Sequence, residues 1–585
     1  MGLRSRILRA LHACRLDADE GRGAQLAVAA ALCIVAALAV PWHGWVGVRS
    51  GGPLVGLAAC AALLVAHARG SRRAAMLATL GGLAACALLV WRWSTPGSDP
   101  LLEVARSQSA LTLAFAGSVL VSAGGALALI GAGALVGRGT EKAEPRERAP
   151  QRPDESPESA ALGGERRESL AAAWRAFWTS RLLVWAAGVL GFLHLGVERT
   201  ITPPPGSRPF GSLGNLLTSP SSSWDADAYL TIAQHGYASG LYFKAFFPLY
   251  PTLVRAGAWS PEMTLVSAIL VSMAALVAAL YLLHRLVTLE LGSHAAGRAV
   301  TFTAFFPMAF FFSAAYTESL FLALSIGALY AARREWWARA GIAGALAAAT
   351  RPTGFVLLLP LMIVYLYGPR GDKSTAASRS APRRVRARLW PRYAVRPDFA
   401  FLFLVPLGAL AFFAYQGAHG DLLAPLHAQE NFWDRSFVPL AGALHGFTDA
   451  VTSLHQIAVG PNRQVLATPT VQTAGQLADP SRLAVVNLID FGFLAFAVLA
   501  TVGAIRRLPP AYGAYCAATI AVAVSTFPPY EPLASLPRYV TVLFPCQIWL
   551  ALWTDDAQRR QMTLVTSAGL LAFFTALFAT WRWVA

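Results

Sequence analysis

Long apolar segments recur along the whole chain, and they constrain its fold more than any other feature. A helix needs about 20 apolar residues to cross a hydrocarbon layer about 30 Å thick. Runs of this kind recur from end to end, and 56% of the 585 residues are hydrophobic while 14% are charged. The runs are continuous and do not alternate with period two, which excludes an outer-membrane barrel. The sequence therefore predicts an all-α polytopic membrane protein.

The predicted spans form two blocks joined by a polar linker. Residues 1–137 hold about four spans rich in Ala, Gly and Leu, which we interpret as an accessory bundle without chemistry. Residues 138–168 are dense in Pro, Glu, Arg and Ser and lack apolar periodicity, which predicts a disordered linker. Residues 169–585 are predicted to hold about 11 spans. Several of these are short, which indicates broken or re-entrant helices around Tyr316 and Arg351.

The distribution of charge predicts the orientation in the membrane. The net charge is +17, and most of the 48 Lys and Arg residues fall on one side when the loops are assigned to alternate sides. By the positive-inside rule this side is cytoplasmic and includes the N-terminus and the linker. The polar segments 198–263 and 418–483 then lie outside. The basic charge is thus a topology signal, and nucleic acid is not an expected partner.

Cysteine usage and nucleotide motifs narrow the chemistry further. The six cysteines fall mostly in apolar runs without metal-ligand spacing, so neither a disulfide framework nor a zinc site is indicated. The chain has neither a P-loop nor a glycine fingerprint after a strand. A reaction on the outer side must therefore use an activated substrate that is available there, and a lipid-linked phosphate donor meets that need.

Two carboxylates stand out in the first outer segment, in the stretch SSSWDADAYLTIAQHGY. Its aromatic and aliphatic residues, which include Trp224 and Tyr229, predict a short amphipathic helix on the membrane surface. Ser222 and Asp225 fit a capping box, so Asp225 could simply stabilise the first helical turn. That alternative does not explain Asp227. Side chains two positions apart on a helix point to different faces, so we expect one base rather than an acid pair.

Further candidates lie in apolar surroundings or in the outer segments. Glu318 is an ionisable residue at predicted membrane depth, with Tyr316 beside it, and such residues usually face a cavity. Lys244, Arg351 and Arg538 are cations near the predicted outer side, suited to a phosphate or a lipid headgroup. Lys244 and Arg351 could instead be interfacial anchors. The stretch GDLLAPLHAQENFW adds groups suited to a sugar or a polar headgroup, namely His427, Gln429 and Trp433.

The same residues carry a resemblance to a known family. The stretch from Trp224 to Tyr237, followed by FFPLYP, YTESLFLAL, ATRPTG, GDLLAPLHAQ and PRYVTVLFP, resembles the PIG-V-like mannosyltransferases of the GT-C superfamily. Eukaryotic members add the second mannose in GPI-anchor assembly. The similarity covers roughly residues 170–582. It implies a GT-C-type transmembrane core, a polyprenyl- or dolichyl-phosphate-linked mannose donor and a catalytic base in the first outer segment. Ala228 departs from the family pattern, which leaves the acceptor open.

The resemblance implies an acid as the base, and a mechanism built on it assigns roles to the other candidate residues as a hypothesis. Asp225 matches the family's acid and is the expected base in a single inverting displacement. The expected ligands of the donor phosphate are Arg351, Arg538 and Lys244. The residues expected to contact substrate are Trp224, Asp227, Tyr229, Tyr316, Glu318, His427, Gln429 and Trp433.

Several expectations stay open at this point. No cofactor is expected, because a cationic side chain can stabilise the leaving phosphate, although Asp225 and Asp227 could together hold a divalent metal ion. The expected partners are a lipid-linked sugar donor, a lipid or glycan acceptor and membrane lipids. The Ala- and Arg-rich composition favours the plasma membrane of a bacterium. A transporter or flippase of lipid-linked sugars remains an alternative, but transporters commonly contain inverted repeats and none is evident. A scaffold without activity would leave the charged candidates unexplained.

Overall fold

The computed structural model describes residues 157–198, 201–369, 393–460, 463–468 and 475–584. These residues are mostly helical, as expected. Five of their helical segments are long and apolar enough to cross a membrane: Gly163–Leu195, Pro261–Leu291, Pro397–Ala418, Pro480–Arg507 and Ala557–Ala579. The predicted N-terminal block of residues 1–137 lies outside the described residues. Helix α8 (Pro157–Leu195) begins inside the segment expected to be a disordered linker, whose first part, residues 138–156, also lies outside them.

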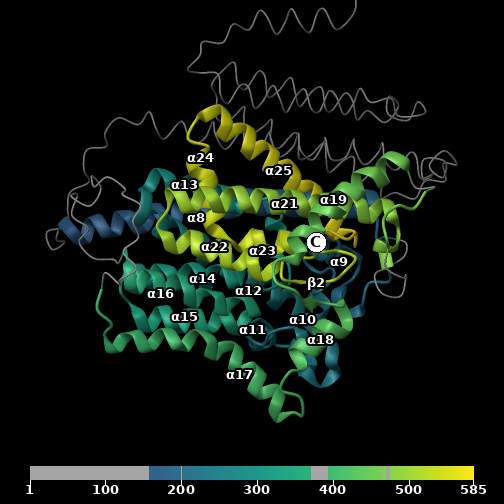
Figure 1. Ribbon diagram of the computed structural model, residues 1–585, viewed down its shortest axis with the longest axis horizontal. Helices are drawn as coiled ribbons and strands as arrows, with labels where there is room; N and C mark the ends of the chain where they lie inside the picture. The colour runs from purple at the N-terminus through teal and green to yellow at the C-terminus, as the bar shows by residue number, and fades with distance from the viewer. Residues whose placement is uncertain (1–156, 199–200, 370–392, 461–462, 469–474, 585) are drawn as a thin grey trace, which may run out of the picture. The chain divides into compact units, whose positions relative to one another are not determined.

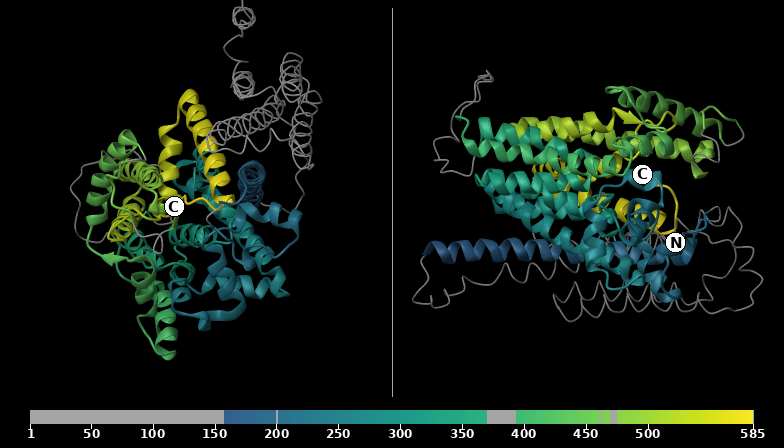
Figure 2. Two further views of the ribbon diagram at one scale, coloured as in Figure 1. Left: turned by 90° about the vertical axis from the view of Figure 1, so that its right-hand side faces the viewer. Right: turned by 90° about the horizontal axis from the view of Figure 1, so that it is seen from below.

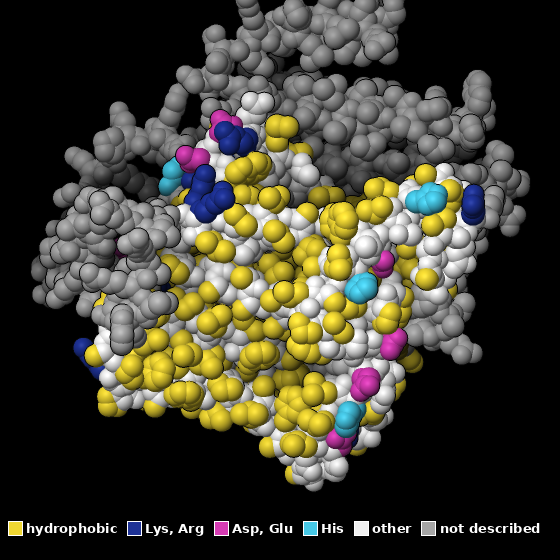
Figure 3. Space-filling model, in the orientation of Figure 1, with side chains coloured by type: hydrophobic (Ala, Val, Ile, Leu, Met, Phe, Trp, Pro, Cys, Tyr) yellow, Lys and Arg dark blue, Asp and Glu magenta, His cyan; other side chains and the backbone are white. Residues whose placement is uncertain are grey.

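Most of the long helices run roughly parallel to one another, whereas α25 (Ala557–Ala579) is inclined to them (Figures 1 and 2). Helix α12 (Thr264–Leu291) packs on α14 (Glu318–Arg333), and α14 packs on α15 (Trp337–Thr350). Helix α15 in turn packs on α17 (Leu404–Ala418). A Cβ atom at Gly408 of α17 would collide with the carbonyl oxygen of Ala345, so this contact depends on glycine. Apolar side chains cover the middle of the face in Figure 3, and charged side chains lie towards its ends, as suits a lipid-facing surface.

The chain is interrupted at both places where broken helices were expected. Helix α13 (Ser293–Ala304) ends before a 3-10 turn, η6 (Ala309–Ser313), which leads to Tyr316 and α14. Arg181 of α8 is buried and donates hydrogen bonds to the carbonyl oxygens of Ala304 and Ala309 and to the Ser313 hydroxyl group. This guanidinium therefore satisfies backbone groups that the interrupted helix leaves free.

The second interruption separates α15 from a 3-10 turn, η7 (Pro352–Leu357), and α16 (Leu358–Tyr367). Proline cannot donate a helical hydrogen bond, and the residue before it prefers an extended backbone. Arg351 accordingly has φ −148° and ψ 145°. The turn then packs back on α15, where a Cβ atom at Gly354 would collide with the backbone of Ala347 and Ala348.

The first outer segment folds into short elements. In chain order these are η1 (Pro205–Ser207), α9 (Ser212–Thr218), η2 (Ser219–Ser221), α10 (Ala226–His235), η3 (Gly236–Ser239), η4 (Leu241–Ala245), α11 (Leu249–Gly257) and η5 (Pro261–Met263). The prediction of a helix after Trp224 is confirmed. The prediction that it lies on the membrane surface is wrong, because Tyr229, Leu230 and Ile232 are buried within the protein.

The second outer segment joins the end of the chain through a small sheet. After η9 (Pro397–Phe403) and α17 come α18 (Ala424–Trp433), β1 (Ser436–Phe437), α19 (Ala441–Val459) and η10 (Gly475–Ala478). Strand β1 pairs antiparallel with β2 (Thr526–Phe527), with Ser436 opposite Phe527 and Phe437 opposite Thr526. This pairing fixes the segment beside the loop that follows β2.

The last helices complete the described unit. They are α21 (Pro480–Arg507), α22 (Pro510–Ala523), α23 (Leu536–Val542), α24 (Phe544–Trp553) and α25 (Ala557–Ala579). The apolar run over residues 538–553 is divided at Leu543, two residues before Pro545, which would otherwise stand inside a continuous helix. Arg538 therefore sits on a short helix of its own.

Candidate functional site

Asp225 and Arg538 form an ion pair between the first outer segment and the short helix α23. Arg538 donates from Nη1 to Asp225 Oδ2 at 2.6 Å. Asp225 occupies the N-cap position of α10, yet its side chain makes no capping hydrogen bond. The capping alternative is therefore wrong, because the guanidinium takes the carboxylate that would otherwise cap the helix. Trp224, just before it, has a left-handed backbone with φ 59°, a strained conformation that often marks functional segments.

Glu318 joins two arginines at the centre of the site. Its Oε1 atom lies 2.8 Å from Arg538 Nε and 3.2 Å from Arg351 Nη1. Glu318 is the first residue of α14, where the positive end of the helix dipole favours a carboxylate. Its side chain is fully buried. A buried carboxylate requires such partners, since an isolated buried charge costs several kcal/mol.

Tyrosine and phenylalanine rings hold the arginines in place. The Tyr316 hydroxyl group donates to the carbonyl oxygen of Ser223 and accepts from the Asp225 N–H, each at 3.0 Å. The Arg538 guanidinium carbon lies 4.9 Å from the Tyr316 ring centroid and 5.3 Å from that of Phe311. These are distances at which the negative face of an aromatic ring attracts a cation. Tyr316 thus positions both partners of the Asp225–Arg538 pair.

Asp227 lies on a different side of α10 from this cluster. A Cβ atom at Gly206 would lie 3.2 Å from Asp227 Oδ1, so the carboxyl group faces η1. Burial raises the pKa of Asp227 above its usual value. Within the described residues no cation lies at ion-pair distance from it. The expectation that the two acids have different surroundings is confirmed.

An aromatic group connects the second outer segment to the acids. Trp433 stacks on Tyr242 with ring centroids 5.1 Å apart, and Tyr242 lies near both Asp225 and Asp227. The ring centroid of Phe246 lies 5.9 Å from that of Trp433 and 5.1 Å from that of Tyr229. Trp433 is therefore brought to the neighbourhood of the cluster by packing.

Three predicted residues have surroundings of their own, apart from the ion-pair cluster. His427 pairs through Nδ1 with Asp421 Oδ2 at 2.8 Å on an exposed part of α18 and its preceding loop. That hydrogen bond lowers the pKa of the Asp421 carboxyl group, and Lys244 acts in the same direction from nearby. Gln429 lies half-buried on α18, where its backbone carbonyl oxygen accepts from the backbone N–H of Arg435.

Two C-terminal tryptophans cover Trp224. Its ring centroid lies 5.7 Å from that of Trp581 and 5.1 Å from that of Trp583. Trp583 Nε1 also donates to Glu531 Oε1 at 3.3 Å. Glu531 is buried, which raises its pKa to about 7, and its carboxyl group interacts with that of Asp490. Sequence reasoning did not select Trp581 or Trp583, because aromatic residues at the end of an apolar run look like interface anchors.

Arg435 is a second feature that sequence reasoning missed. It precedes β1, and its Nη2 atom donates to Ser535 Oγ at 3.3 Å and to the Ala534 carbonyl oxygen at 3.5 Å. Its guanidinium also interacts with Tyr539, one residue after Arg538. The only signal in the sequence was a cation in an outer segment shortly after His427 and Trp433.

The assembled cluster suits proton transfer next to anion binding. Asp225 keeps a side-chain exposure of 23%, against 0% for Glu318, so it is the carboxylate that a substrate can reach. The arginines are permanently charged donors beside it. Within the described residues there is no group of three or more His, Cys, Asp and Glu side chains that could hold a metal ion.

Known proteins resemble this chain over the segment that carries most of the cluster. Residues 210–366 match the family described as Mannosyltransferase (PIG-V). The mouse (Mus musculus) protein GPI alpha-1,6-mannosyltransferase 2 is 37% identical over 172 residues, which is 26% of this chain and 34% of that relative. The chain thus matches about a third of the relative's length. No solved structure matches the chain. The resemblance inferred from the sequence blocks is confirmed for the first four, from Trp224 to Gly354, while GDLLAPLHAQ and PRYVTVLFP lie beyond the matched segment.

Proposed function

We propose that this chain is a membrane glycosyltransferase that transfers mannose from a polyprenyl-phosphate-linked donor to a lipid- or glycan-linked acceptor. The observation that carries the proposal is the cluster of Asp225, Glu318, Arg351 and Arg538. Three of these residues lie in the segment that matches PIG-V mannosyltransferases. Charged groups buried among apolar helices rarely persist without a function.

Asp225 is the general base in this proposal. One of its oxygens is held by Arg538, and the other makes no hydrogen bond within the described part of the chain. The free oxygen takes the proton of the acceptor hydroxyl group while the acceptor oxygen attacks the anomeric carbon of the donor sugar. The bond from this carbon to the phosphate oxygen breaks in the same step, which inverts the anomeric configuration.

Cations next to the base stabilise the leaving group. The departing lipid phosphate gains negative charge as the glycosidic bond breaks, and fixed positive groups stabilise a charge that develops in the transition state. Arg538 contacts Asp225, Arg351 contacts Glu318 in the same cluster, and Lys244 is a third candidate from η4. This chemistry requires no cofactor or metal ion.

The reaction takes place on the extracytoplasmic side of a bacterial plasma membrane, with the N-terminus in the cytoplasm. The excess of Lys and Arg in the other loops supports this orientation. The substrate contacts nearest the base are Trp224, Asp227, Tyr229, Tyr316, Glu318 and Trp433. His427 and Gln429 lie further from the base on α18 and contact the acceptor. Similarity to mannosyltransferases does not favour the alternative of a transporter or flippase.

A transfer assay tests the proposal. Isolated membranes containing the full chain are incubated with polyprenyl phosphate carrying radiolabelled mannose, and labelled product and free lipid phosphate are measured together. Transfer with equal release of lipid phosphate is expected from the wild type and from Glu262→Gln, at an exposed carboxylate outside the cluster, but not from Asp225→Asn. Movement of intact donor across the membrane without bond cleavage would indicate a flippase. Normal turnover by Asp225→Asn would exclude Asp225 as the base.

A further inference from the structure

Three guanidinium groups converge on Tyr539 of α23. The Arg351 guanidinium carbon lies 5.1 Å from the Tyr539 ring centroid. Arg435 interacts with the Tyr539 side chain, and Arg538 lies near enough to act on it electrostatically. The three arginines come from the break after α15, from the turn before β1 and from α23 itself. Such convergence of like charges opposes folding unless anions balance it.

The described carboxylates do not balance these three arginines. Asp225 and Glu318 are both taken by Arg538, at 2.6 and 2.8 Å. Arg351 has Glu318 at 3.2 Å but makes no hydrogen bond from its buried Nη1 atom. Arg435 has no carboxylate at ion-pair distance within the described residues, and its buried Nε atom also lacks a hydrogen-bond partner. Glu531 acts on Arg435 only from beyond that distance. One positive charge is therefore left over beside Tyr539.

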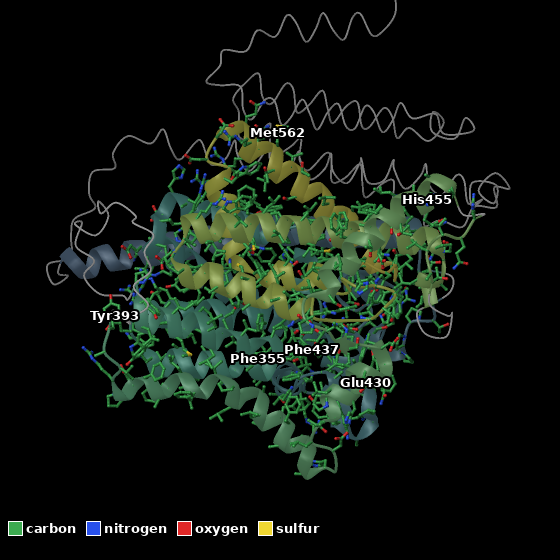
Figure 4. The ribbon with its side chains drawn as sticks, viewed as in Figure 1. Phe355, Tyr393, Glu430, Phe437, His455 and Met562 are labelled. Carbon is green, nitrogen blue, oxygen red and sulfur yellow. The ribbon has the colours of Figure 1, made fainter. Side chains whose placement is uncertain are left out.

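The fold holds Arg435 in this place. Arg435 immediately precedes β1, and the pairing of Ser436 with Phe527 ties this turn to the chain that leads into α23. The hydrogen bonds from Arg435 to Ser535 and Ala534 add a second connection to the same loop. Phe437, two residues later, lies at the surface with 69% exposure (Figure 4). Arg435 and Tyr539 are themselves partly exposed, so a phosphate group can reach the subsite from the surface.

We infer that Arg435, Arg351 and the Tyr539 hydroxyl group form a subsite that binds a phosphate ester, whereas Arg538 holds Asp225 in position and acts on the phosphate only through its charge. Planar guanidinium groups with free N–H donors bind phosphate oxygens in pairs. Arg538 has few N–H donors left for a third anion, because it already pairs with the carboxylates of Asp225 and Glu318. The identification of the ester as the donor lipid rests on the proposed function. The existence of a phosphate subsite rests only on the convergence of the arginines and does not depend on the proposed function.

Binding of polyprenyl phosphate without a sugar tests this inference directly. The full chain is placed in lipid nanodiscs, and the dissociation constant of radiolabelled polyprenyl phosphate is measured. Arg435→Gln is expected to weaken binding roughly tenfold, and Arg435→Lys less, because charge remains without the guanidinium fork. Tyr539→Phe should weaken binding a few-fold. Arg538→Lys should change binding less than Arg435→Gln.

Arg334→Gln is the matched control. Arg334 is half-buried, lies 5.9 Å from the Tyr330 ring and has a buried Nε atom without a hydrogen-bond partner, like Arg435. It follows α14 at the end opposite Glu318, about 24 Å away by helix geometry. Its replacement should leave binding unchanged. If Arg435→Gln fails to fold, Tyr539→Phe and Arg435→Lys carry the test.

The controls separate the source of the phosphate from the existence of the subsite. Polyprenol should not compete, and competition by inorganic phosphate would indicate that the headgroup alone suffices. Unchanged binding by Arg435→Gln, or equal competition by polyprenol, would overturn the inference. Binding that depends on Arg435 in a chain that transfers no mannose would keep the subsite and reject the proposed function.

Discussion

Asp225 and Arg538 meet at 2.6 Å although 313 positions separate them in the sequence. Their contact joins the start of α10 to a helix of seven residues near the end of the chain. Arg538 also contacts Glu318, so a partly exposed carboxylate, Asp225, is coupled to one that is fully buried. This coupling determines how substitutions in the cluster should combine.

We predict strong non-additivity between Glu318 and Arg538. Arg538→Gln leaves Glu318 buried without its nearest hydrogen-bonding cation and should lower the free energy of unfolding by about 3–5 kcal/mol. Glu318→Gln should also destabilise the protein, because it leaves Arg351 and Arg538 close together. The double variant should lose less than the sum of the two, by about 1–3 kcal/mol. Denaturant titrations in detergent micelles measure these values. Additive losses within about 0.5 kcal/mol would show that the contact is energetically unimportant.

Tyr316→Phe should impair turnover more than donor binding. The change removes the hydroxyl group that bridges the Ser223 carbonyl and the Asp225 N–H but keeps the ring against Arg538. Loss of about 1.4 kcal/mol in positioning corresponds to a tenfold fall in kcat. Tyr250→Phe is the control, because Tyr250 is equally buried but bonds Ala268 and Ser272 instead. Equal kcat values for the two variants would contradict the proposal that the Tyr316 hydroxyl group positions Asp225.

Stability should depend on pH through Glu531. Burial raises the pKa of Glu531 from 4.5 to about 7, so between these values the folded state binds a proton that the unfolded state has released. Stability due to this group is present below about pH 4.5 and is lost as the pH rises through about 7. Melting temperatures measured from pH 5 to 8 should fall more steeply for the wild type than for Glu531→Gln. Glu262→Gln, at an exposed carboxylate, should follow the wild type. Parallel curves for all three proteins would contradict the prediction.

Trp583→Ala should reduce both stability and turnover. The indole packs edge-on against Trp224 and donates to Glu531, so its loss opens the wall beside Asp225 and leaves a buried acceptor without its donor. We expect a loss of about 2–3 kcal/mol in unfolding free energy and a several-fold lower kcat. Trp583→Phe should recover part of the packing but not the hydrogen bond. Trp553→Ala, at a partly exposed tryptophan stacked on Trp549, should leave kcat unchanged.

The residues of the cluster could be selected from the sequence because they break an apolar pattern. Glu318, Arg351 and Arg538 stand in apolar or aromatic surroundings where an ionisable side chain requires a reason. Their mutual pairing could not be predicted, since pattern and spacing do not indicate which segments meet. The same limit explains Arg435, whose partners Ser535 and Tyr539 lie about 100 positions away in the sequence.

Two local predictions were wrong because tertiary contacts took precedence over them. The pattern of Ser222 and Asp225 is typical of a capped helix start. In the structure the Asp225 carboxylate pairs with Arg538 and makes no capping hydrogen bond. The aromatic residues around Tyr229 suit a membrane surface, and the same residues also suit a protein interior. Sequence alone does not distinguish these two environments, because both are apolar with scattered polar contacts.

The division of the cluster between early and late parts of the chain has a consequence for biosynthesis. Glu318 precedes Arg538 by 220 positions, so it is translated before its closest cationic partner exists. Arg351 follows soon after Glu318 and lies within ion-pair distance in the finished protein. It can neutralise the nascent carboxylate while the remaining helices are being inserted. Arg351 can then serve as a provisional counter-ion, and the cluster of four charged residues is complete only after α23 has been translated.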